Sequence, residues 1–173
     1  ESEETTHFSV WDNQGNIVSN TYTLNFAYGS GIAVAGAGFL LNNEMDDFSA
    51  KPGTANGYGL IGGTANAIQP KKRPLSSMTP TIVFNANGKP SLATGSPGGS
   101  TIITIVLQMI LNTSEFNMGL AEATAAPRFH HQWLPDMAYF ENGISSDSLN
   151  LLKKMGHQIS PQSRVLGSTQ SIV

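Results

Sequence analysis

The sequence predicts an α+β fold with a mostly antiparallel sheet. The first half of the chain holds two stretches rich in β-branched and aromatic residues, and a turn sequence interrupts each of them. The longer helical patterns lie in the second half. Strand and helix patterns do not alternate regularly, as they would in a parallel sheet built from βαβ units, so hairpins with helices packed against them are expected.

The first hairpin is predicted between residues 6 and 24. Its arms are residues 7–11 and 17–24, and the turn between them is Asp-Asn-Gln-Gly-Asn at 12–16. A third strand is predicted over residues 31–41, where the Gly and Ala content indicates a bulge or a close approach of the backbone.

A second hairpin is predicted from residues 80–84 and 91–94, which flank the turn sequence at 85–89. The hairpin leads through a Gly-rich turn into residues 101–111, which are apolar nearly all round. This pattern predicts a helix that is buried on most of its faces, with Ser100 as its cap.

Two further helices and one long loop follow from local signals. A short helix is predicted around 118–125, ended by Pro127, and another over 147–155, capped by a Ser/Asp cluster and closed by Gly156. Residues 51–69 are dominated by Gly, Asn, Ala and Thr. A loop this long inside a compact domain is usually functional or disordered, and its functional interpretation is a lid.

The composition indicates a single domain that works with a partner. The chain has 173 residues, which suits one domain. Only 12% of the residues are charged, about half of the usual share of roughly 25%. Because a surface so poor in charge dissolves badly by itself, we expect a partner to cover much of it.

Several functional classes are disfavoured by the same numbers. The net charge is -3 and the basic residues cluster only at 71–73, which argues against nucleic-acid binding. The chain has no cysteine, which excludes disulfides, thiolate metal sites and thiol nucleophiles. The longest apolar run, 102–111, is too short to cross a bilayer core of roughly 30 Å. The acidic residues 1–4 are the reverse of a basic signal-peptide start, and the absence of an initial Met predicts a piece of a longer precursor.

Thr5 could act as a nucleophile only under one condition. A threonine hydroxyl is a weak nucleophile until a base takes its proton, and the α-amine of an N-terminal threonine, with a reference pKa of about 7.7–8.0, can be that base. Four residues precede Thr5, so this chemistry requires cleavage of the bond between Glu4 and Thr5. Otherwise Thr5 is an ordinary polar residue at the start of a strand.

Two other pairs of residues have open interpretations. Gly98 and Gly99 could be turn glycines, a phosphate-binding loop, or backbone N–H donors for a developing oxyanion. Nucleotide binding is the weakest of these, because the loop lacks the lysine and the spacing of a Walker motif. Glu44 and Asp47 stand three residues apart and form either a solvated acidic turn or a pair that holds an ammonium group.

The remaining polar clusters carry weaker signals. Ser76 and Ser77 are adjacent hydroxyls that could donate to a carboxylate or simply stabilise a turn. Residues 128–136 are dense in aromatic and hydrogen-bonding side chains and are interpreted as structural. His130 and His131 are neighbours, which places them poorly for sharing one ion, so no metal site is predicted.

Six segments carry a more specific signal. They are Thr-Thr-His-Phe-Ser-Val at 5–10, Thr-Tyr-Thr-Leu-Asn at 21–25, Leu-Asn-Asn-Glu-Met-Asp-Asp-Phe-Ser at 41–49, Lys-Arg-Pro-Leu-Ser-Ser-Met at 72–78, Thr-Gly-Ser-Pro-Gly-Gly-Ser at 94–100 and Ala-Pro-Arg-Phe-His-His-Gln-Trp-Leu-Pro at 126–135. With these motifs, nearly the whole chain resembles the small, C-terminal subunit of bacterial γ-glutamyltranspeptidases, within the N-terminal nucleophile hydrolase superfamily.

The resemblance implies a two-step acyl transfer. The precursor would cut itself before Thr5, and Thr5 would then attack the γ-glutamyl carbonyl of glutathione or a related amide. Water, or the amine of an amino acid or peptide, would resolve the resulting ester. Thr23 would support the nucleophile, and Gly98 and Gly99 would form the oxyanion hole.

The same resemblance implies a site for the γ-glutamyl donor. Its α-amino end would be held by Asn25, Glu44 and Asp47. Its α-carboxylate would be held by Ser76 and Ser77, together with an arginine on the large subunit that this chain lacks.

Tyr58 matches the tyrosine of the lid that covers the pocket in many bacterial members, which places the lid at about residues 51–69. Relatives that act as glutaryl β-lactam acylases share the threonine chemistry without needing to recognise an α-ammonium. The presence of both Glu44 and Asp47 favours γ-glutamyl donors, because two carboxylates facing an uncharged group would be poorly compensated. A non-catalytic binding subunit, or a stalled precursor, is the alternative from another functional class.

The resemblance also implies an organisation for the chain. Residues 1–4 would be the remnant of the precursor ahead of the cleavage site, and residues 5–173 would be the small catalytic subunit. This subunit would form an αββα sandwich that the large subunit of the same precursor completes, as a heterodimer. No cofactor is implied, and the location would be periplasmic or secreted. Family members usually continue past the position of Val173 through a short final segment.

Overall fold

The computed structural model describes residues 5–173, so Glu4 of the predicted cleavage site lies outside the described residues. The predicted first hairpin is confirmed. Strand β1 (Thr6–Trp11) pairs antiparallel with β2 (Ile17–Tyr22), and Thr6 lies opposite Tyr22. The turn is held by the Asp12 carboxylate, whose Oδ1 accepts the backbone N–H groups of Gln14 and Asn16.

The second hairpin is also confirmed. It consists of β3 (Thr81–Phe84) and β4 (Pro90–Thr94), with a bulge between Val83 and Phe84. The C-terminal segment runs beside β4, because Ala93 and Ile172 exchange both of their backbone hydrogen bonds. A third, very short antiparallel pair joins β5 (Phe129–His130) to β6 (Tyr139–Phe140).

The predicted strand over residues 31–41 is wrong. The segment forms consecutive turns with a single isolated bridge between Ala33 and Leu40. Gly36 and Gly38 both have positive φ, and they turn the backbone so that Val34 N–H reaches the Phe39 carbonyl at 2.9 Å. Positive φ is a turn conformation that glycine adopts without steric cost, so the glycine content here marks turns rather than a bulged strand.

Three α-helices form where the sequence predicts them. They are α1 (Ile102–Ser114), α2 (Leu120–Ala125) and α3 (Ser146–Lys154), and the short 3-10 helix η3 (Gly99–Thr101) leads into α1. α3 ends at Gly156, which has positive φ, as predicted. The predicted caps are wrong: neither α1 nor α3 has a side-chain cap bond, and the Ser100 hydroxyl donates to Gln132 Oε1 instead.

The prediction that the first long helix is buried on most faces is also wrong for the described chain. Its buried residues form one stripe at helical spacing: Ile102, Ile105, Val106 and Met109. Ile103 and Leu107, on the opposite side, are each about half exposed, at 49% and 51%. One apolar face of α1 is therefore left without a covering layer in this chain.

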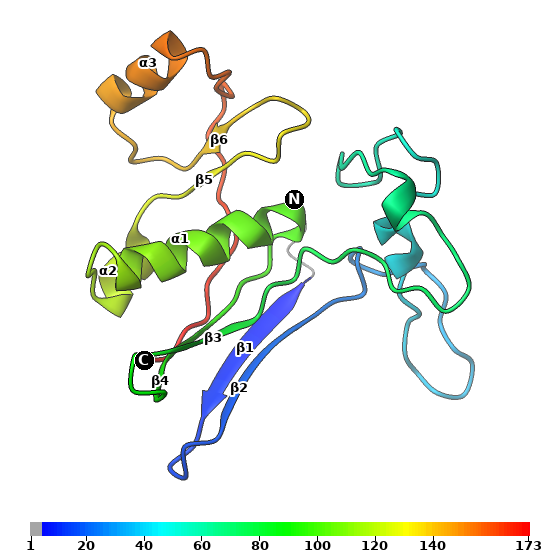
Figure 1. The fold of residues 1–173 in the computed structure, drawn as a ribbon. Coiled ribbons are helices and arrows are strands. Elements are labelled where there is room, and N and C mark those ends of the chain that lie inside the picture. The colour runs from blue at the N-terminus through cyan, green and yellow to red at the C-terminus, as the bar shows by residue number, and fades with distance from the viewer. Residues whose placement is uncertain (1–4) are drawn as a thin grey trace.

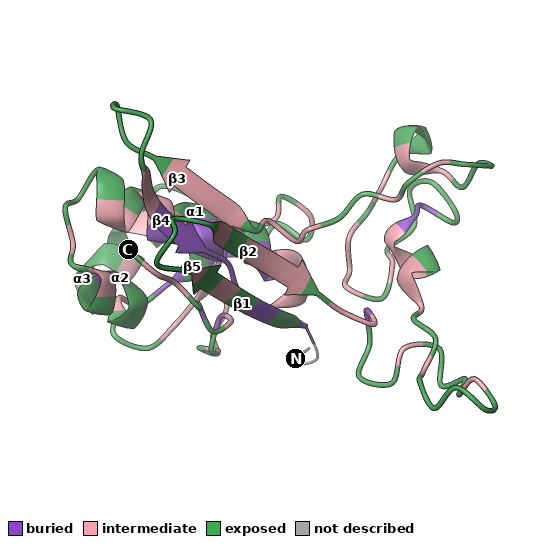
Figure 2. Ribbon diagram, turned by 90° about the horizontal axis from the view of Figure 1, so that it is seen from below, coloured by how far each residue is buried: buried purple, intermediate pink, exposed green. Residues whose placement is uncertain are grey.

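The core lies where α1 packs across β4. Figure 2 shows buried backbone concentrated on β4 and around the neighbouring part of α1, with most of the remaining chain intermediate or exposed. Leu92, Ala93, Ile105 and Leu166 are among the buried residues at its centre. No helix within residues 5–173 is both long and apolar enough to span a membrane.

A separate lobe extends from the end of β2. Figure 1 shows residues from about 25 to 78 as a group of loops beside the hairpins, on the side away from α2. The lobe contains the 3-10 helices η1 (Glu44–Asp47) and η2 (Thr64–Asn66). Its junction with the hairpins lies at the start of β1, and this is where the predicted site residues meet.

Candidate active site

The centre of the site is the pair Thr5 and Thr23. The β1–β2 register, in which Thr6 faces Tyr22, places the residue before β1 next to the residue after β2. Thr5 Oγ1 donates to Thr23 Oγ1 at 3.1 Å, and Thr5 is only 5% exposed. Thr23 Oγ1 also accepts the backbone N–H of Asn25 at 2.9 Å. These two contacts fix the Thr23 hydroxyl against the proposed nucleophile.

The predicted residues converge on one small cavity of about 30 Å³. All of them except Gly98 line it: Thr5, Thr23, Asn25, Glu44, Asp47, Tyr58, Ser76, Ser77 and Gly99. They come from the β1 start, the β2 end, η1, the loop over residues 51–69, the 74–78 segment and the turn before α1. A cavity of this volume holds little more than one or two water-sized groups.

The turn that precedes η3 and α1 requires a glycine at position 98. This residue has φ of +143°, and a Cβ there would lie 2.8 Å from Thr101 Oγ1. Both the N–H and the hydroxyl of Thr101 donate to the Gly98 carbonyl, at 3.1 and 2.8 Å. The turn is thereby tied to the beginning of α1, with Gly99 on the cavity wall beside Thr5.

Glu44 and Asp47 form a hydrogen-bonded acidic pair on η1. Burial, helped by the hydrogen bond and the negative charge of Asp47, raises the pKa of Glu44 to about 7. Burial also raises the pKa of Asp47; the charge of Asp46 adds to this, and the hydrogen bond with Glu44 opposes it. Within residues 5–173 neither carboxylate has an ion pair with Lys or Arg. Two close carboxylates without a cation are strained electrostatically, and a bound ammonium group would relieve that strain.

The serine segment, residues 74–78, also lines the cavity. Ser76 Oγ accepts the Met78 N–H at 3.2 Å, and the Leu75 N–H donates to Asn66 Oδ1 at 2.9 Å. Ser76 and Ser77 both reach the cavity, as predicted. Among the described residues, no group of three or more His, Cys, Asp or Glu side chains is placed to hold a metal ion.

With this geometry in view, the chain can be compared with known proteins. All of residues 1–173 match the family model described as gamma-glutamyltranspeptidase. The chain belongs to the gamma-glutamyltranspeptidase family. It is 58% identical over its whole length to a glutathione hydrolase proenzyme of Escherichia coli K12, and 51% identical over 99% of its length to one of Pseudomonas aeruginosa. It spans only 30% and 31% of these relatives, less than a third of their length.

Solved structures of the gamma-glutamyltranspeptidase family share the fold. A crystal structure of an acivicin-inhibited gamma-glutamyltranspeptidase is 58% identical with a TM-score of 0.91, covering 96% of this chain and 88% of the other. The T380A mutant from Helicobacter pylori is 57% identical, also with a TM-score of 0.91, and covers 96% and 89%. A cephalosporin acylase from Bacillus halodurans is 27% identical with a TM-score of 0.79 and covers 95% of this chain and 29% of that one.

Sequence reasoning missed the role of Asp46 in this member of the family. Asp46 stands between Glu44 and Asp47, and it contacts the lid rather than the cavity. Its Oδ2 accepts the Gly57 N–H at 3.0 Å, and its carbonyl accepts the Asn56 side-chain amide at 3.3 Å. The sequence carries no signal for this role, because Asp46 and Asp47 are adjacent residues of the same type.

The lid is held at its tip by two further contacts. Tyr58 OH donates to the Asn25 carbonyl at 2.7 Å, and the Tyr58 ring meets Phe26 edge-on at 5.6 Å between centroids. Asn25 is 3% exposed and has positive φ, so its carbonyl is presented to Tyr58 from an unusual backbone conformation. The tip of the 51–69 loop therefore packs against residues 25–26, and Tyr58 lines the Thr5 cavity.

Residues of the 128–136 segment make mainly structural contacts. Arg128 is 8% exposed and pairs with Glu141 at 3.5 Å. His130 is 1% exposed and bonds Thr104 Oγ1 through Nδ1 at 2.8 Å and Gln132 Oε1 through Nε2 at 3.0 Å. Burial lowers the pKa of His130. These contacts agree with the structural interpretation of the segment.

Replacing Gly57 with Ala should open the lid. A Cβ at Gly57 would lie 2.5 Å from Phe26 Cζ and 2.8 Å from Asp46 Oδ2, so either the tip lifts or these two side chains, which contact it, move away from it. Overpacking of this kind costs about 1–3 kcal/mol, so we expect chymotryptic cleavage after Tyr58 in the full-length protein to become roughly tenfold faster or more. Cleavage is followed by mass spectrometry. Gly63→Ala is the matched control in the same loop, because its Cβ would meet nothing within 4 Å. Equal cleavage of the two variants would contradict the packing of the tip.

Proposed function

We propose that this chain is the catalytic small subunit of a self-processing γ-glutamyl transferase and hydrolase, acting on glutathione and other γ-glutamyl amides. The observation that carries the proposal is the hydrogen bond between Thr5 and Thr23 in a cavity that also holds the Glu44–Asp47 pair. The names of the relatives support it, since they are glutathione hydrolase proenzymes. Residues 1–4 are then the precursor remnant and residues 5–173 the mature subunit.

Acylation of Thr5 follows from its surroundings. Once the Glu4–Thr5 bond is cut, the free α-amine of Thr5 takes the proton of its own hydroxyl. Thr23 Oγ1 holds that oxygen in place during attack on the γ-glutamyl carbonyl. The backbone N–H groups of Gly98 and Gly99 stabilise the oxyanion, and the proton passes to the departing amine. The product is a γ-glutamyl ester on Thr5, which water or an acceptor amine resolves.

Donor recognition divides between the two charged ends of the γ-glutamyl group. The α-ammonium group sits against Glu44 and Asp47, with Asn25 as a hydrogen-bonding partner, and relieves the repulsion between the two carboxylates. The α-carboxylate accepts hydrogen bonds from Ser76 and Ser77 and pairs with an arginine of the large subunit. Tyr58 closes the lid over the bound donor.

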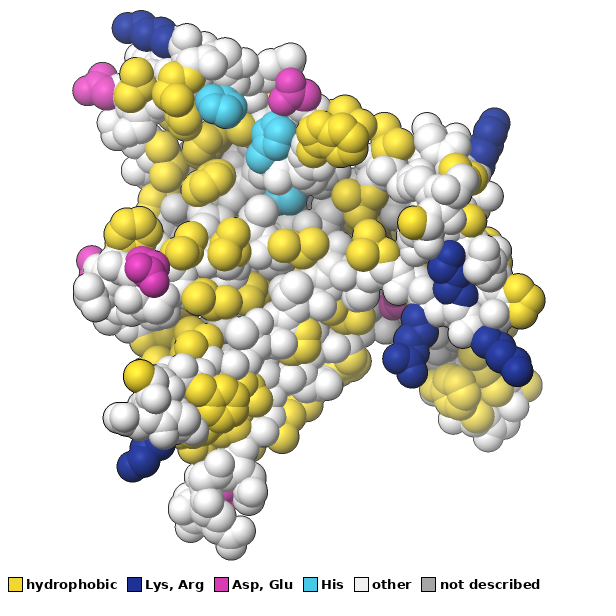
Figure 3. Space-filling view, in the orientation of Figure 1, with side chains coloured by type: hydrophobic (Ala, Val, Ile, Leu, Met, Phe, Trp, Pro, Cys, Tyr) yellow, Lys and Arg dark blue, Asp and Glu magenta, His cyan; other side chains and the backbone are white. Residues whose placement is uncertain are grey.

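The large subunit completes the fold in this proposal. Phe8, Val10, Val18 and Tyr22 point outward from β1 and β2 and are between 42% and 55% exposed, whereas His7, between them, is 5% exposed on the inner face. Figure 3 shows further hydrophobic side chains along the surface over α1. Exposed apolar patches of this extent mark interfaces. We assign the hairpin face to a second sheet from the large subunit, giving an αββα sandwich as a heterodimer, in a periplasmic or secreted enzyme.

Two alternatives are less well supported. The cephalosporin acylase with the same fold makes a glutaryl β-lactam acylase the enzymatic alternative. The pair of adjacent carboxylates argues against it, because a glutaryl group has no ammonium to neutralise them. A non-catalytic binding subunit, in which the Glu4–Thr5 bond stays intact, is the other alternative.

Thr5→Ala in the full-length precursor should abolish both cleavage and turnover. We expect the wild type to yield a new N-terminus at Thr5 by Edman sequencing, and the variant to stay uncut. Release of p-nitroaniline from γ-glutamyl-p-nitroanilide should fall by at least about a thousandfold, as for other removed nucleophiles. Thr6→Ala, on the neighbouring exposed residue, should process and turn over normally. A Thr5→Ala protein that still released p-nitroaniline would refute the nucleophile.

The preference for a γ-glutamyl donor should rise with pH. Because burial raises the pKa of Glu44 to about 7, Glu44 is neutral below this pH and adds a second negative charge above it. The ratio of kcat/KM for γ-glutamyl-p-nitroanilide to that for glutaryl-p-nitroanilide should therefore increase through pH 7. Titration of the Thr5 amine affects kcat/KM for both donors equally, so it cancels in the ratio. Glu44→Gln should flatten the profile, and an unchanged slope would assign the titration to another group.

Asp47→Asn should separate the two donor classes. It removes a charge that only the ammonium-bearing donor uses, so kcat/KM for the γ-glutamyl amide should fall by about tenfold to a hundredfold, as expected for a charge-assisted hydrogen bond. The value for the glutaryl amide should change much less. The donor assignment fails if the γ-glutamyl amide loses no more than the glutaryl amide.

A further inference from the structure

A second and much larger cavity lies directly behind the lid tip. Its volume is about 1030 Å³. Tyr58 and Ser100 line both this cavity and the small one that contains Thr5, so these two residues form the shared wall. The other side of the large cavity is formed by the 132–139 loop and the C-terminal segment 164–168.

The two cavities carry opposite charge. The charged residues that line the Thr5 cavity are Glu44 and Asp47. Of the described residues that line the large cavity, Arg164 is the one charged side chain. A ligand that spans the shared wall therefore meets carboxylates on the Thr5 side and a guanidinium on the other.

Arg164 is held in place without a carboxylate partner. Its guanidinium carbon lies 3.6 Å from the centroid of the Tyr139 ring, and its backbone N–H donates to the Phe140 carbonyl at 3.3 Å. Among residues 5–173 no Asp or Glu forms an ion pair with it, and its Nε is buried without a hydrogen-bond partner. Stacking on an aromatic ring fixes the plane of the guanidinium and leaves the N–H groups at its edge available to an anion.

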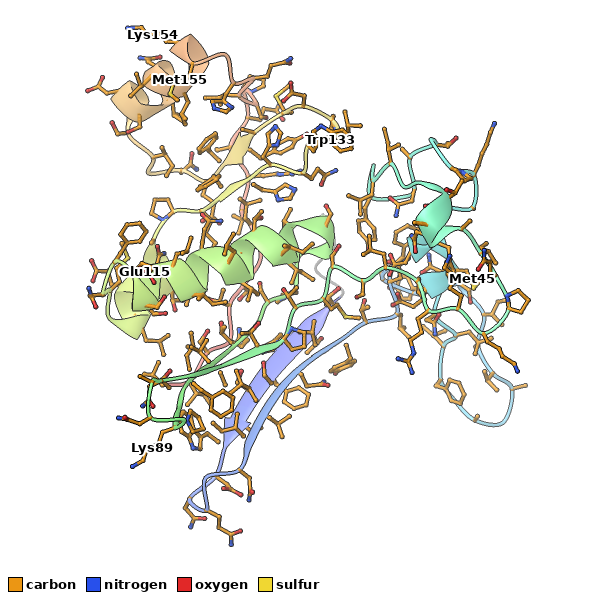
Figure 4. The ribbon with its side chains drawn as sticks, in the orientation of Figure 1. Met45, Lys89, Glu115, Trp133, Lys154 and Met155 are labelled. Carbon is orange, nitrogen blue, oxygen red and sulfur yellow. The ribbon has the colours of Figure 1, made fainter. Side chains whose placement is uncertain are left out.

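The neighbourhood of Arg164 is otherwise fixed and neutral. His130 lies close enough for the Arg164 charge to contribute to the lowering of its pKa, although burial is the larger cause. Gln132 Oε1 accepts hydrogen bonds from Ser100 and His130, so the 132–139 loop is tied to the turn before α1. Figure 4 shows Trp133 at the edge of this loop, on the side that faces the lobe carrying Met45.

We propose that the large cavity binds the acceptor, an amino acid or peptide with a free α-carboxylate, and that Arg164 binds this carboxylate. The inference rests on the proposed function, because it needs an acyl group on Thr5. A carboxylate matches the planar fork of the guanidinium with two parallel hydrogen bonds. Its amine is then directed toward the shared wall and the ester.

The transfer step balances with groups already described. The neutral amine nitrogen of the acceptor attacks the ester carbonyl, a C–N bond forms, and the bond from the carbonyl carbon to Thr5 Oγ1 breaks. One amine proton returns to Thr5 Oγ1, which regenerates the hydroxyl bonded to Thr23. Arg164 touches the acceptor but no reacting atom, so it determines acceptor specificity rather than the rate of acylation.

The test compares two acceptors that differ only in their C-terminal charge. Glycylglycine and glycylglycinamide are offered to the processed heterodimer with γ-glutamyl-p-nitroanilide as donor. Each KM is calculated from the concentration of the unprotonated amine, which is the form that attacks the ester. The wild type should prefer glycylglycine by about tenfold or more, the expected strength of a charge-assisted bond. Arg164→Gln should remove this preference by raising the KM for glycylglycine, and Arg164→Lys should restore part of it.

Hydrolysis in the absence of acceptor is the internal control. It should stay near the wild-type rate in Arg164→Gln, which also reports that the variant folds and processes. Lys89→Gln, in the turn between β3 and β4 far from both cavities (Figure 4), is the matched loss of a positive charge and should leave the preference intact. A wild type without any preference for the carboxylate, or an Arg164→Gln variant that keeps it, would overturn the proposal. If hydrolysis is absent from the wild type as well, the proposed function itself fails.

Discussion

The hydrogen bond between Thr5 and Thr23 depends on the register of one hairpin, and the site is arranged around it. Because successive side chains of a strand alternate between faces, a slip of one residue between β1 and β2 would turn Thr5 away from the cavity. The inner face of the hairpin locks this register: His7 bonds Thr21 Oγ1 at 2.7 Å and Ser9 Oγ at 3.1 Å. A Cβ at Gly95 would collide with the His7 ring, so the chain entering the glycine turn packs directly against this ring. Thr5, at the start of this hairpin, and the glycine turn are thus positioned by the same buried imidazole.

The η1 turn directs its three acidic side chains to two different places. The 3-10 turn of η1 carries Glu44 and Asp47 toward the Thr5 cavity and Asp46 toward the lid, where it accepts the Gly57 N–H. Holding two carboxylates close together without a cation costs free energy, and burial raises the cost. In the proposed enzyme the donor ammonium recovers that cost on binding. The 51–69 loop is attached to the same turn through Asp46, so in the proposed enzyme donor recognition and lid closure share one short element.

The secondary structure was predictable where the signal is local. Hairpin turns, the long apolar helix and the glycine that ends α3 depend on residues close in sequence, and all three were found. The prediction of a strand at 31–41 was wrong because Gly36 and Gly38 adopt positive φ. The alanine and glycine content of the segment does not by itself reveal this conformation. Ser100 failed as a cap because Gln132, 32 residues away, supplies a competing acceptor for its hydroxyl. Such competition depends on contacts that only the folded chain creates.

The sequence by itself determined the family, because the six motifs quoted above occur in order, and it determined which residue types the site contains. Tertiary structure alone decided how the charged groups divide: which carboxylate faces the Thr5 cavity, which one contacts the 51–69 loop, and which arginine lines the large cavity. Asp46 is indistinguishable from Asp47 in the printed sequence, and Arg164 lies in a segment with no recognisable motif. The physical reason is that motif residues act through their own chemistry, which the sequence records. Asp46 and Arg164 act through a backbone amide and an aromatic ring brought to them by folding, and Thr5 lies beside Thr23 for the same reason.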